Sequence, residues 1–172
     1  MRAENVLLET GEACWLIPDE TRRDEWHWSI SGDNGETGTT YDRDYAIRVA
    51  TWTSARRMWH ARPVAGFSVA DAIALDRADR SEYTRTLKRL IVASTGLPAA
   101  EISVRGHRGT ASSWVGVYGT TDRARTWIAA LFGRCAPGEA LIPPTRGYRA
   151  WHAARAAGLD GSGIELADHG WD

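Results

Sequence analysis

The sequence predicts an α+β fold with a β-rich N-terminal part, a helical middle, a helix–hairpin–helix (α-β-β-α) unit and a C-terminal helix. Polar and apolar residues alternate within the first 30 residues, which is the period of half-buried strands. From residue 42 onward the apolar residues recur at helical spacing. Two strand patterns then stand side by side between residues 101 and 118, with a helical pattern before and after them.

The N-terminal part is predicted to hold a hairpin and one further strand. Residues 5–8 and 13–17 flank a Glu-Thr-Gly-Glu turn, which favours a hairpin. In residues 26–30, two tryptophans and an isoleucine alternate with a histidine and a serine, so a strand with one buried face is expected. Residues 31–40 are rich in Gly, Asp, Asn and Thr, and this composition predicts a loop.

Helices are predicted for the middle of the chain. Residues 42–62 favour a long helix because their large apolar side chains fall near one face. The run from 45 to 49 would also serve as a strand, and that alternative stays open. Ser68 is expected to cap a short helix over residues 69–75. A clearer helical pattern covers residues 80–94, and a glycine and a proline directly after it are its stop signals.

The last third of the chain is predicted to begin with a β-hairpin. Residues 101–105 and 112–118 have strand patterns, joined by a glycine-rich turn, and a threonine-capped helix follows. The proline pair at 143–144 predicts a linker, after which residues 145–158 are expected to form the last helix. A short strand is expected in the tail, at residues 163–166.

The length of 172 residues suits one domain over residues 1–172. Within it, residues 1–66 would form an acidic β-rich sub-lobe with its helix, and residues 67–172 a basic α/β sub-lobe with an acidic tail. No stretch approaches 18 uninterrupted apolar residues and the N-terminus shows no signal pattern, so we expect a cytoplasmic protein without a membrane partner. Four of the nine tryptophans are expected in the core: Trp15, Trp52, Trp59 and Trp127.

The charges are sorted along the chain. Residues 1–44 hold 4 Arg against 11 Asp or Glu, a net −7; residues 45–159 hold 17 Arg or Lys against 7 acids, a net +10; residues 160–172 hold 4 acids. Either the acidic ends fold back and neutralise the basic middle, or the basic middle attracts phosphates or an acidic protein surface. Of the 21 basic residues, 20 are arginines. Arginine suits bidentate recognition of phosphate, although a GC-rich genome would also produce this excess.

The hairpin near residues 101–118 is the best candidate binding site. Alternation places its valines on one face and an arginine with two aromatic residues on the other, and such a face can stack bases and pair phosphates. Further basic residues lie near the turn and on the preceding helix. The predicted contacts to nucleic acid or a partner are Arg85, Lys88, Arg89, Arg105, His107, Arg108, Trp114 and Tyr118. Alternatively, Trp114 and Tyr118 pack under the N-terminal part or the C-terminal helix and leave a solvated turn of arginines.

Residues 101–132 resemble the small α/β modules of unassigned function found in large polyvalent proteins of phages and other mobile elements. The likeness lies in a strand that ends in Arg-Gly-Thr-Ala at residues 108–111, a second strand with Trp114 and Val115, and a helix from Asp122. The resemblance covers about a fifth of the chain. It implies a mobile-element neighbourhood and no activity.

The sequence leans away from catalysis. It has no GxSxG elbow, no P-loop and no HExxH motif, and no histidine pairs with another His or a Cys at metal-ligand spacing. We therefore expect no cofactor and no metal. A zinc site would need His60, His152, Cys14 or Cys135 to converge, and general acid–base work would fall to His107 with Glu101 or Asp122.

Two functions of different classes stay open, with a small enzyme as a third. The first is a non-catalytic binding protein that acts on nucleic acid or a nucleoprotein complex and is associated with a phage or mobile element. The second is a protein-binding inhibitor of a host defence complex, similar to anti-CRISPR proteins. In that case the acidic N-terminal segment would mimic or displace a nucleic-acid backbone.

Overall fold

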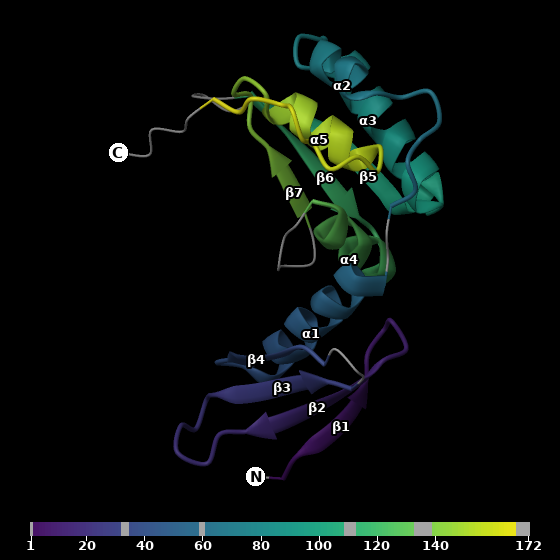
Figure 1. Ribbon diagram of the computed structural model, residues 1–172. Helices are drawn as coiled ribbons and strands as arrows, with labels where there is room; N and C mark the ends of the chain where they lie inside the picture. Colours follow the sequence, from purple (N-terminus) through teal and green to yellow (C-terminus); the bar gives the residue numbers. More distant parts are fainter. Residues whose placement is uncertain (1, 32–34, 59–60, 109–112, 133–138, 168–172) are drawn as a thin grey trace.

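The computed structural model describes residues 2–31, 35–58, 61–108, 113–132 and 139–167, and these form an α+β fold. Figure 1 shows two lobes, with helices α1 and α4 packed against each other between them. The N-terminal lobe holds strands β1–β4 and helix α1; the C-terminal lobe holds the rest. The elements are β1 (Glu4–Leu7), β2 (Ala13–Pro18), β3 (Trp26–Ile30), β4 (Thr37–Thr40), α1 (Arg43–Met58), α2 (Val69–Leu75), α3 (Arg80–Thr95), η1 (Ala99–Glu101), β5 (Ile102–Arg108), β6 (Ser113–Gly119), α4 (Asp122–Leu131), β7 (Glu139–Ile142) and α5 (Tyr148–Ala156).

The N-terminal sheet is antiparallel, in the order β1-β2-β3-β4. Its helix-side face carries the buried side chains of Leu16, Trp28 and Ile30, which form one hydrophobic cluster with Ala46 and Ala50 of α1. Small alanine side chains let the helix approach the sheet closely. The segment 45–49 is thus helical and not a strand, because its alanine side pairs with this apolar face.

The C-terminal sheet is also antiparallel, in the order β5-β6-β7. Its helix-side face carries Ile102, Val115 and Val117, which share a buried cluster with residues of α3, α4 and α5. Helix α3 contributes the predicted inward residues, among them the fully buried Tyr83. The Tyr83 hydroxyl donates to the backbone carbonyl of Arg149 at 2.9 Å, and its burial raises the pKa of that hydroxyl.

Local sequence signals correctly predicted the start of α2 and the end of α3. Ser68 accepts from the Asp71 amide and Asp71 accepts from the Ser68 amide, a capping box that begins α2. Gly96 ends α3 in a left-handed conformation, as the glycine stop signal predicted. Helix α5 is capped from elsewhere in the chain: the Asp76 carboxylate accepts from the amides of Gly147 and Ala150, which fixes α2 against the start of α5.

Several sequence-based expectations were wrong. The predicted loop 31–40 ends in strand β4, which pairs with β3, and β7 precedes the proline pair where no strand was expected. The predicted strand at 163–166 is absent from the described tail; instead the tail crosses the start of α5, where the Ala167 amide donates to the Arg146 carbonyl at 3.1 Å. Trp15 is 44% exposed and therefore outside the core. Trp127 is buried, as predicted, and Trp59 lies outside the described residues.

No helix in the described ranges is long and apolar enough to cross a membrane.

Candidate functional surfaces

The β5–β6 hairpin has the two faces that alternation predicted. The register pairs Ser103 with Tyr118, Arg105 with Gly116 and His107 with Trp114, so these positions share one face. The intervening residues Val104, Val115 and Val117 pack into the helix-side cluster. We call the opposite side the C-terminal outer face; its members with described side chains are Ser103, Arg105, Trp114, Tyr118 and Leu141 of β7, together with Gly116.

Arg105 lies exposed on the C-terminal outer face. Its Nε donates to the Ser103 hydroxyl at 2.9 Å, which holds the guanidinium along β5. Within the described part of the chain, no carboxylate lies within ion-pair distance of Arg105. The Tyr118 ring lies directly over Gly116, where any Cβ would approach the phenol to 2.5 Å. Glycine at this position therefore lets the ring rest on the sheet, half-exposed beside Arg105.

Trp114 and Tyr118 are both half-buried. One alternative from the sequence was that the C-terminal helix covers Trp114 and Tyr118. The register places them away from α5, because α5 contributes to the buried cluster on the other face of the sheet.

The remaining predicted contact residues do not all join this face. By the register, His107 is at a position on the same face of β5 as Arg105, and Arg108 is at a position on the opposite face. The side chains of both residues are outside the described part of the structure. Arg85 and Arg89 are exposed and Lys88 half-buried on α3, whose opposite side packs into the helix-side cluster. The α3 residues therefore lie across the lobe from Arg105 and do not extend its face.

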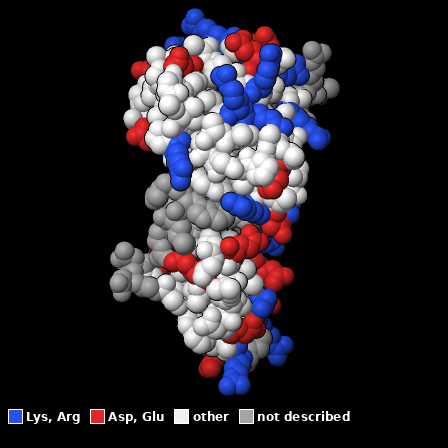
Figure 2. Space-filling view, turned by 90° about the vertical axis from the view of Figure 1, so that its right-hand side faces the viewer, with Lys and Arg blue, Asp and Glu red and all other residues white. Residues whose placement is uncertain are grey.

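The charge separation seen in the sequence persists between the lobes. Figure 2 shows Lys and Arg gathered over the upper part of one side, where Figure 1 places α2 and α3, with some Asp and Glu at its top. On the lower lobe Asp and Glu lie above a group of basic residues at its lower end. Within residues 1–44, described side chains pair with one another: Arg22 with Glu25, His27 with Asp19, and Arg43 with Glu4 and Asp44.

The N-terminal sheet also has an open side, which the sequence analysis did not single out. Helix α1 packs on one face, and the strand residues of the other face alternate with the buried ones. On this face Leu7 is 77%, Trp15 44% and Ile17 45% exposed. We call it the N-terminal outer face; its strand positions are Asn5, Leu7, Ala13, Trp15, Ile17, His27, Ser29, Thr37 and Thr39.

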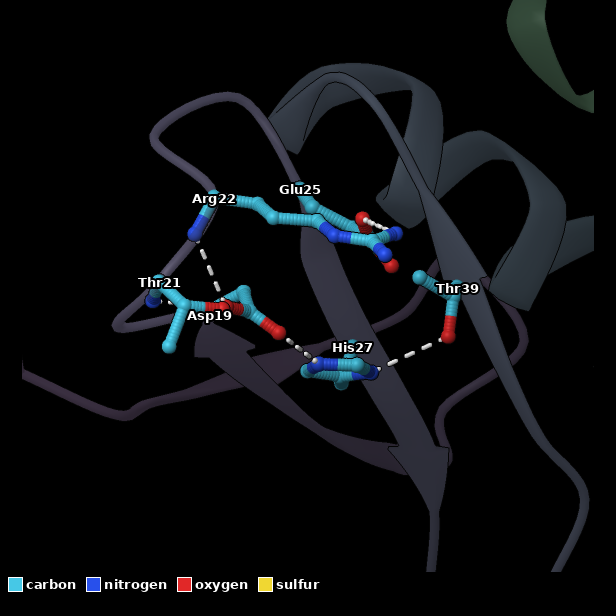
Figure 3. A network of polar contacts seen from close by, with 6 residues as sticks. All are labelled: Asp19, Thr21, Arg22, Glu25, His27 and Thr39. Atoms are coloured by element: carbon cyan, nitrogen blue, oxygen red, sulfur yellow. Dashed lines mark hydrogen bonds and ion pairs between the residues drawn. The ribbon is translucent and has the colours of Figure 1, made fainter.

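A polar network crosses one end of the N-terminal outer face (Figure 3). The His27 Nε2 lies 3.0 Å from the Asp19 carboxylate, and its Nδ1 lies 3.0 Å from the Thr39 hydroxyl. Asp19 also accepts from the hydroxyl and amide of Thr21 and from the Arg22 amide. The Thr21 hydroxyl and the His27 ring, followed by these two amides, hold the pKa of Asp19 well below its usual range.

The order carboxylate, imidazole, hydroxyl has the logic of an activated nucleophile. The surroundings do not support that chemistry: the network lies on an open sheet face, and three grooves formed by described residues lie elsewhere. Asp19, Glu25 and His27 also converge closely enough to hold a cation. Arg22 already pairs with the Glu25 carboxylate at 2.9 Å, and both His27 nitrogens have protein partners, so we assign no metal to this cluster.

Of these three grooves, one lies between the lobes and two lie in the C-terminal lobe. One of about 420 Å³ lies between the lobes, where the Thr126 hydroxyl donates to Glu9 at 3.4 Å. A second, of about 460 Å³, lies between α2, the start of α5 and the tail, and includes Asp76, the cap of α5. The third, of about 480 Å³, is a shallow groove between α2 and α3 that Arg89 shares with Asp71 and Glu82. Arg77 lines the same groove, so two carboxylates and two guanidinium groups surround it.

Comparison with known proteins gives no further guidance. No family model matches the chain. No curated protein matches it, and no solved structure does. The surfaces described above therefore carry the functional argument by themselves.

Proposed function

We propose that the protein is a non-catalytic binding protein that contacts single-stranded nucleic acid through the C-terminal outer face. The observation that carries the proposal is the common face of Arg105, Trp114 and Tyr118, set by the register of the hairpin. Aromatic rings on an open antiparallel sheet are a platform on which bases stack, and an arginine beside them can pair with a phosphate. The resemblance of residues 101–132 to modules of mobile-element proteins adds that a phage or plasmid would be the setting.

The electrostatics of the C-terminal lobe support the same function. Residues 61–167 contain 14 Arg or Lys and 9 Asp or Glu, a net +5, so the lobe attracts a polyanion over a distance. Arg105 has no acidic partner among the described residues that would have to be displaced. The protein would act by occupying the nucleic-acid strand and would not catalyse a reaction on it.

The test is fluorescence anisotropy of labelled single- and double-stranded DNA and RNA, titrated at several salt concentrations. Replacing Tyr118 or Trp114 by leucine should weaken single-strand binding about 5- to 150-fold, which corresponds to about 1–3 kcal/mol for one stacked base. Arg105→Gln should weaken binding and reduce the slope against log salt by about one.

Arg85→Gln is the matched control, because Arg85 is an exposed arginine on the far side of the lobe. It should change the affinity by less than about two-fold, since only the long-range field of one charge is lost. Absence of binding at low salt, or equal losses for the Arg85 and Arg105 variants, would show that the C-terminal outer face is not a nucleic-acid site.

A protein-binding inhibitor of a host nucleoprotein complex is the second candidate. It is favoured by the separation of charge, because residues 1–44 carry a net −7 and residues 61–167 a net +5. Charge reversal at Asp24 and Glu20, both exposed, would then abolish inhibition of such a complex while free oligonucleotides fail to bind. Glu25 is less suitable for this reversal because Arg22 pairs with it.

A further inference from the structure

The N-terminal outer face exposes three large apolar side chains to solvent. Leu7, Trp15 and Ile17 lie on adjacent strands β1 and β2, and the register shows that all three point to the same side. Trp15 stands between Asn5 and Ser29, and Ile17 stands beside His27. The strand positions of this face carry no Asp, Glu, Lys or Arg. An apolar patch of this kind on one side of a sheet is typical of an interaction surface.

The polar groups of this face are held in place before any partner arrives. His27 is fixed at both ring nitrogens by Asp19 and Thr39, and Asp19 is fixed in turn by Thr21 and the Arg22 amide (Figure 3). The ring therefore stands in one orientation beside Ile17. A surface ordered in advance loses less conformational entropy on binding than a mobile one.

The charges around the face select a positively charged partner. The Asp19 amide donates to the Glu25 carbonyl at 2.8 Å, which continues the ladder by one pair and brings two carboxylates to the end of the face. Glu20 and Asp24 are exposed in the same loop, which also holds Arg22, paired with Glu25, and the exposed Arg23. Over the whole N-terminal lobe, residues 1–58, 7 Arg stand against 11 Asp or Glu, a net charge of −4. This field repels nucleic acid, and it equally repels the same lobe of a second copy.

We propose that the N-terminal outer face docks a basic protein segment, in which an apolar side chain covers Trp15 and Ile17 while flanking arginines or lysines pair with the carboxylates of the β2–β3 loop. The proposal rests on the second candidate function and names its surface and the chemistry of its partner. It does not require the C-terminal lobe to bind nucleic acid. The two surfaces lie on different lobes, so one protein could contact both components of a nucleoprotein complex.

The probe is a short labelled peptide in which arginine alternates with leucine, with a glutamate–leucine and an arginine–serine peptide as controls. Binding to the full chain is followed by amide chemical shifts and by anisotropy. The arginine–leucine peptide should shift amides of β1–β3 and the β2–β3 loop. The arginine–serine peptide should bind at least about five-fold more weakly, because it lacks the apolar contact. The glutamate–leucine peptide should not bind.

The decisive variant is Trp15→Thr with Ile17→Thr, since threonine keeps a strong strand preference at these exposed positions. It should weaken the arginine–leucine peptide at least about ten-fold, because both apolar contacts are lost. Ile73→Thr is the control, as Ile73 is equally exposed, at 48%, but belongs to α2 of the other lobe. The thermal midpoint of each variant shows that it is folded.

Four results would overturn the proposal: shifts confined to the C-terminal lobe, equal affinity of the double variant, equal affinity of the arginine–serine peptide, or a dimer of the free protein that the double variant abolishes. The last would make a second copy the occupant. Failure of this docking proposal can be told apart from failure of the nucleic-acid proposal. Arg105→Gln, which tests nucleic-acid binding, should leave the affinity for the peptide within about two-fold of the wild type.

Discussion

The two sheets of this protein are built alike and present opposite chemistry. Each is antiparallel, each covers one face with helices, and each leaves the alternate residues on an outer face. The N-terminal outer face exposes Leu7, Trp15 and Ile17 and has carboxylates at one end, whereas the C-terminal outer face combines Arg105 with two aromatic residues. The two lobes therefore differ mainly in the strand residues that point away from the core.

In each sheet an aromatic ring packs over a glycine, on the helix-side face in the N-terminal lobe and on the outer face in the C-terminal lobe. In the N-terminal lobe the Trp28 ring lies over Gly38 on the buried, helix-side face, with only 6% of Trp28 exposed. In the C-terminal lobe the Tyr118 ring lies over Gly116 on the outer face. The same local contact thus supports a core in one lobe and a candidate binding surface in the other.

The largest expected effect comes from truncating each core in turn. Leu16→Ala and Leu87→Ala remove fully buried side chains from two clusters that share no member, and each should cost about 2–5 kcal/mol of the free energy of unfolding. Hydrogen exchange should then lose protection in β1–β4 for the first variant and in α3 and β5–β7 for the second. Equal loss in both lobes for both variants would show that the lobes open as one unit.

The glycines allow a sharper comparison at smaller cost. Gly38→Ala would place a Cβ 2.5 Å from the ring of the buried Trp28, which has little room to move, so we expect a loss of about 1–3 kcal/mol. Gly116→Ala makes the same contact with the half-exposed Tyr118, whose ring can swing away, so a loss below about 1 kcal/mol is expected. Urea unfolding of both variants measures the difference. A larger loss at Gly116 would mean that the Tyr118 ring is held as firmly as that of Trp28.

The fold class and most elements were predictable because their signals are local. Alternation identified β2 and β3, and caps located α2 and α3. The strands β4 and β7 were missed because their sequences carry no strand pattern: β4 (Thr-Gly-Thr-Thr) continues a run rich in Gly and Thr, and β7 (Glu-Ala-Leu-Ile) does not alternate. Pairing with β3 and β6 decides their conformation. In β4, Gly38 looked like a loop residue, yet it provides the space that the Trp28 ring fills.

The candidate surfaces were predictable only as far as one hairpin extends. Alternation alone placed Arg105 with Trp114 and Tyr118, and the register confirmed it. The separation of Arg85 and Arg89 from that face depends on how α3 packs, which no local pattern contains. The His27 network joins residues from β2–β3 and β4, so it required the register of three strands. The one sequence signal was the outward position of His27 in its alternating strand.

The smallest expected effect concerns two carboxylates, one in each lobe. Asp19 receives hydrogen bonds from Thr21, His27 and Arg22, and Asp71 receives them from Ser68; both pKa values are lowered, that of Asp19 further. A carboxylate whose pKa is lower in the folded state adds stability above its unfolded pKa, about 4, and loses it as the pH falls through the folded value. Asp19→Asn should therefore lower the thermal midpoint at neutral pH, and the difference from wild type should shrink below about pH 4, where the Asp19 carboxyl of the unfolded chain takes up its proton while that of the folded protein is still ionised.

Asp71→Asn should follow the same course with a smaller amplitude, because fewer hydrogen bonds favour its charged form. Thermal unfolding followed by circular dichroism at both pH values measures the two differences. An offset for Asp19→Asn that is the same at neutral and acid pH would mean that its carboxylate acts by shape and not by charge. In that case the order of the N-terminal outer face would not depend on Asp19 ionisation, and only the amide-compatible hydrogen bonds to Thr21 and Arg22 would matter.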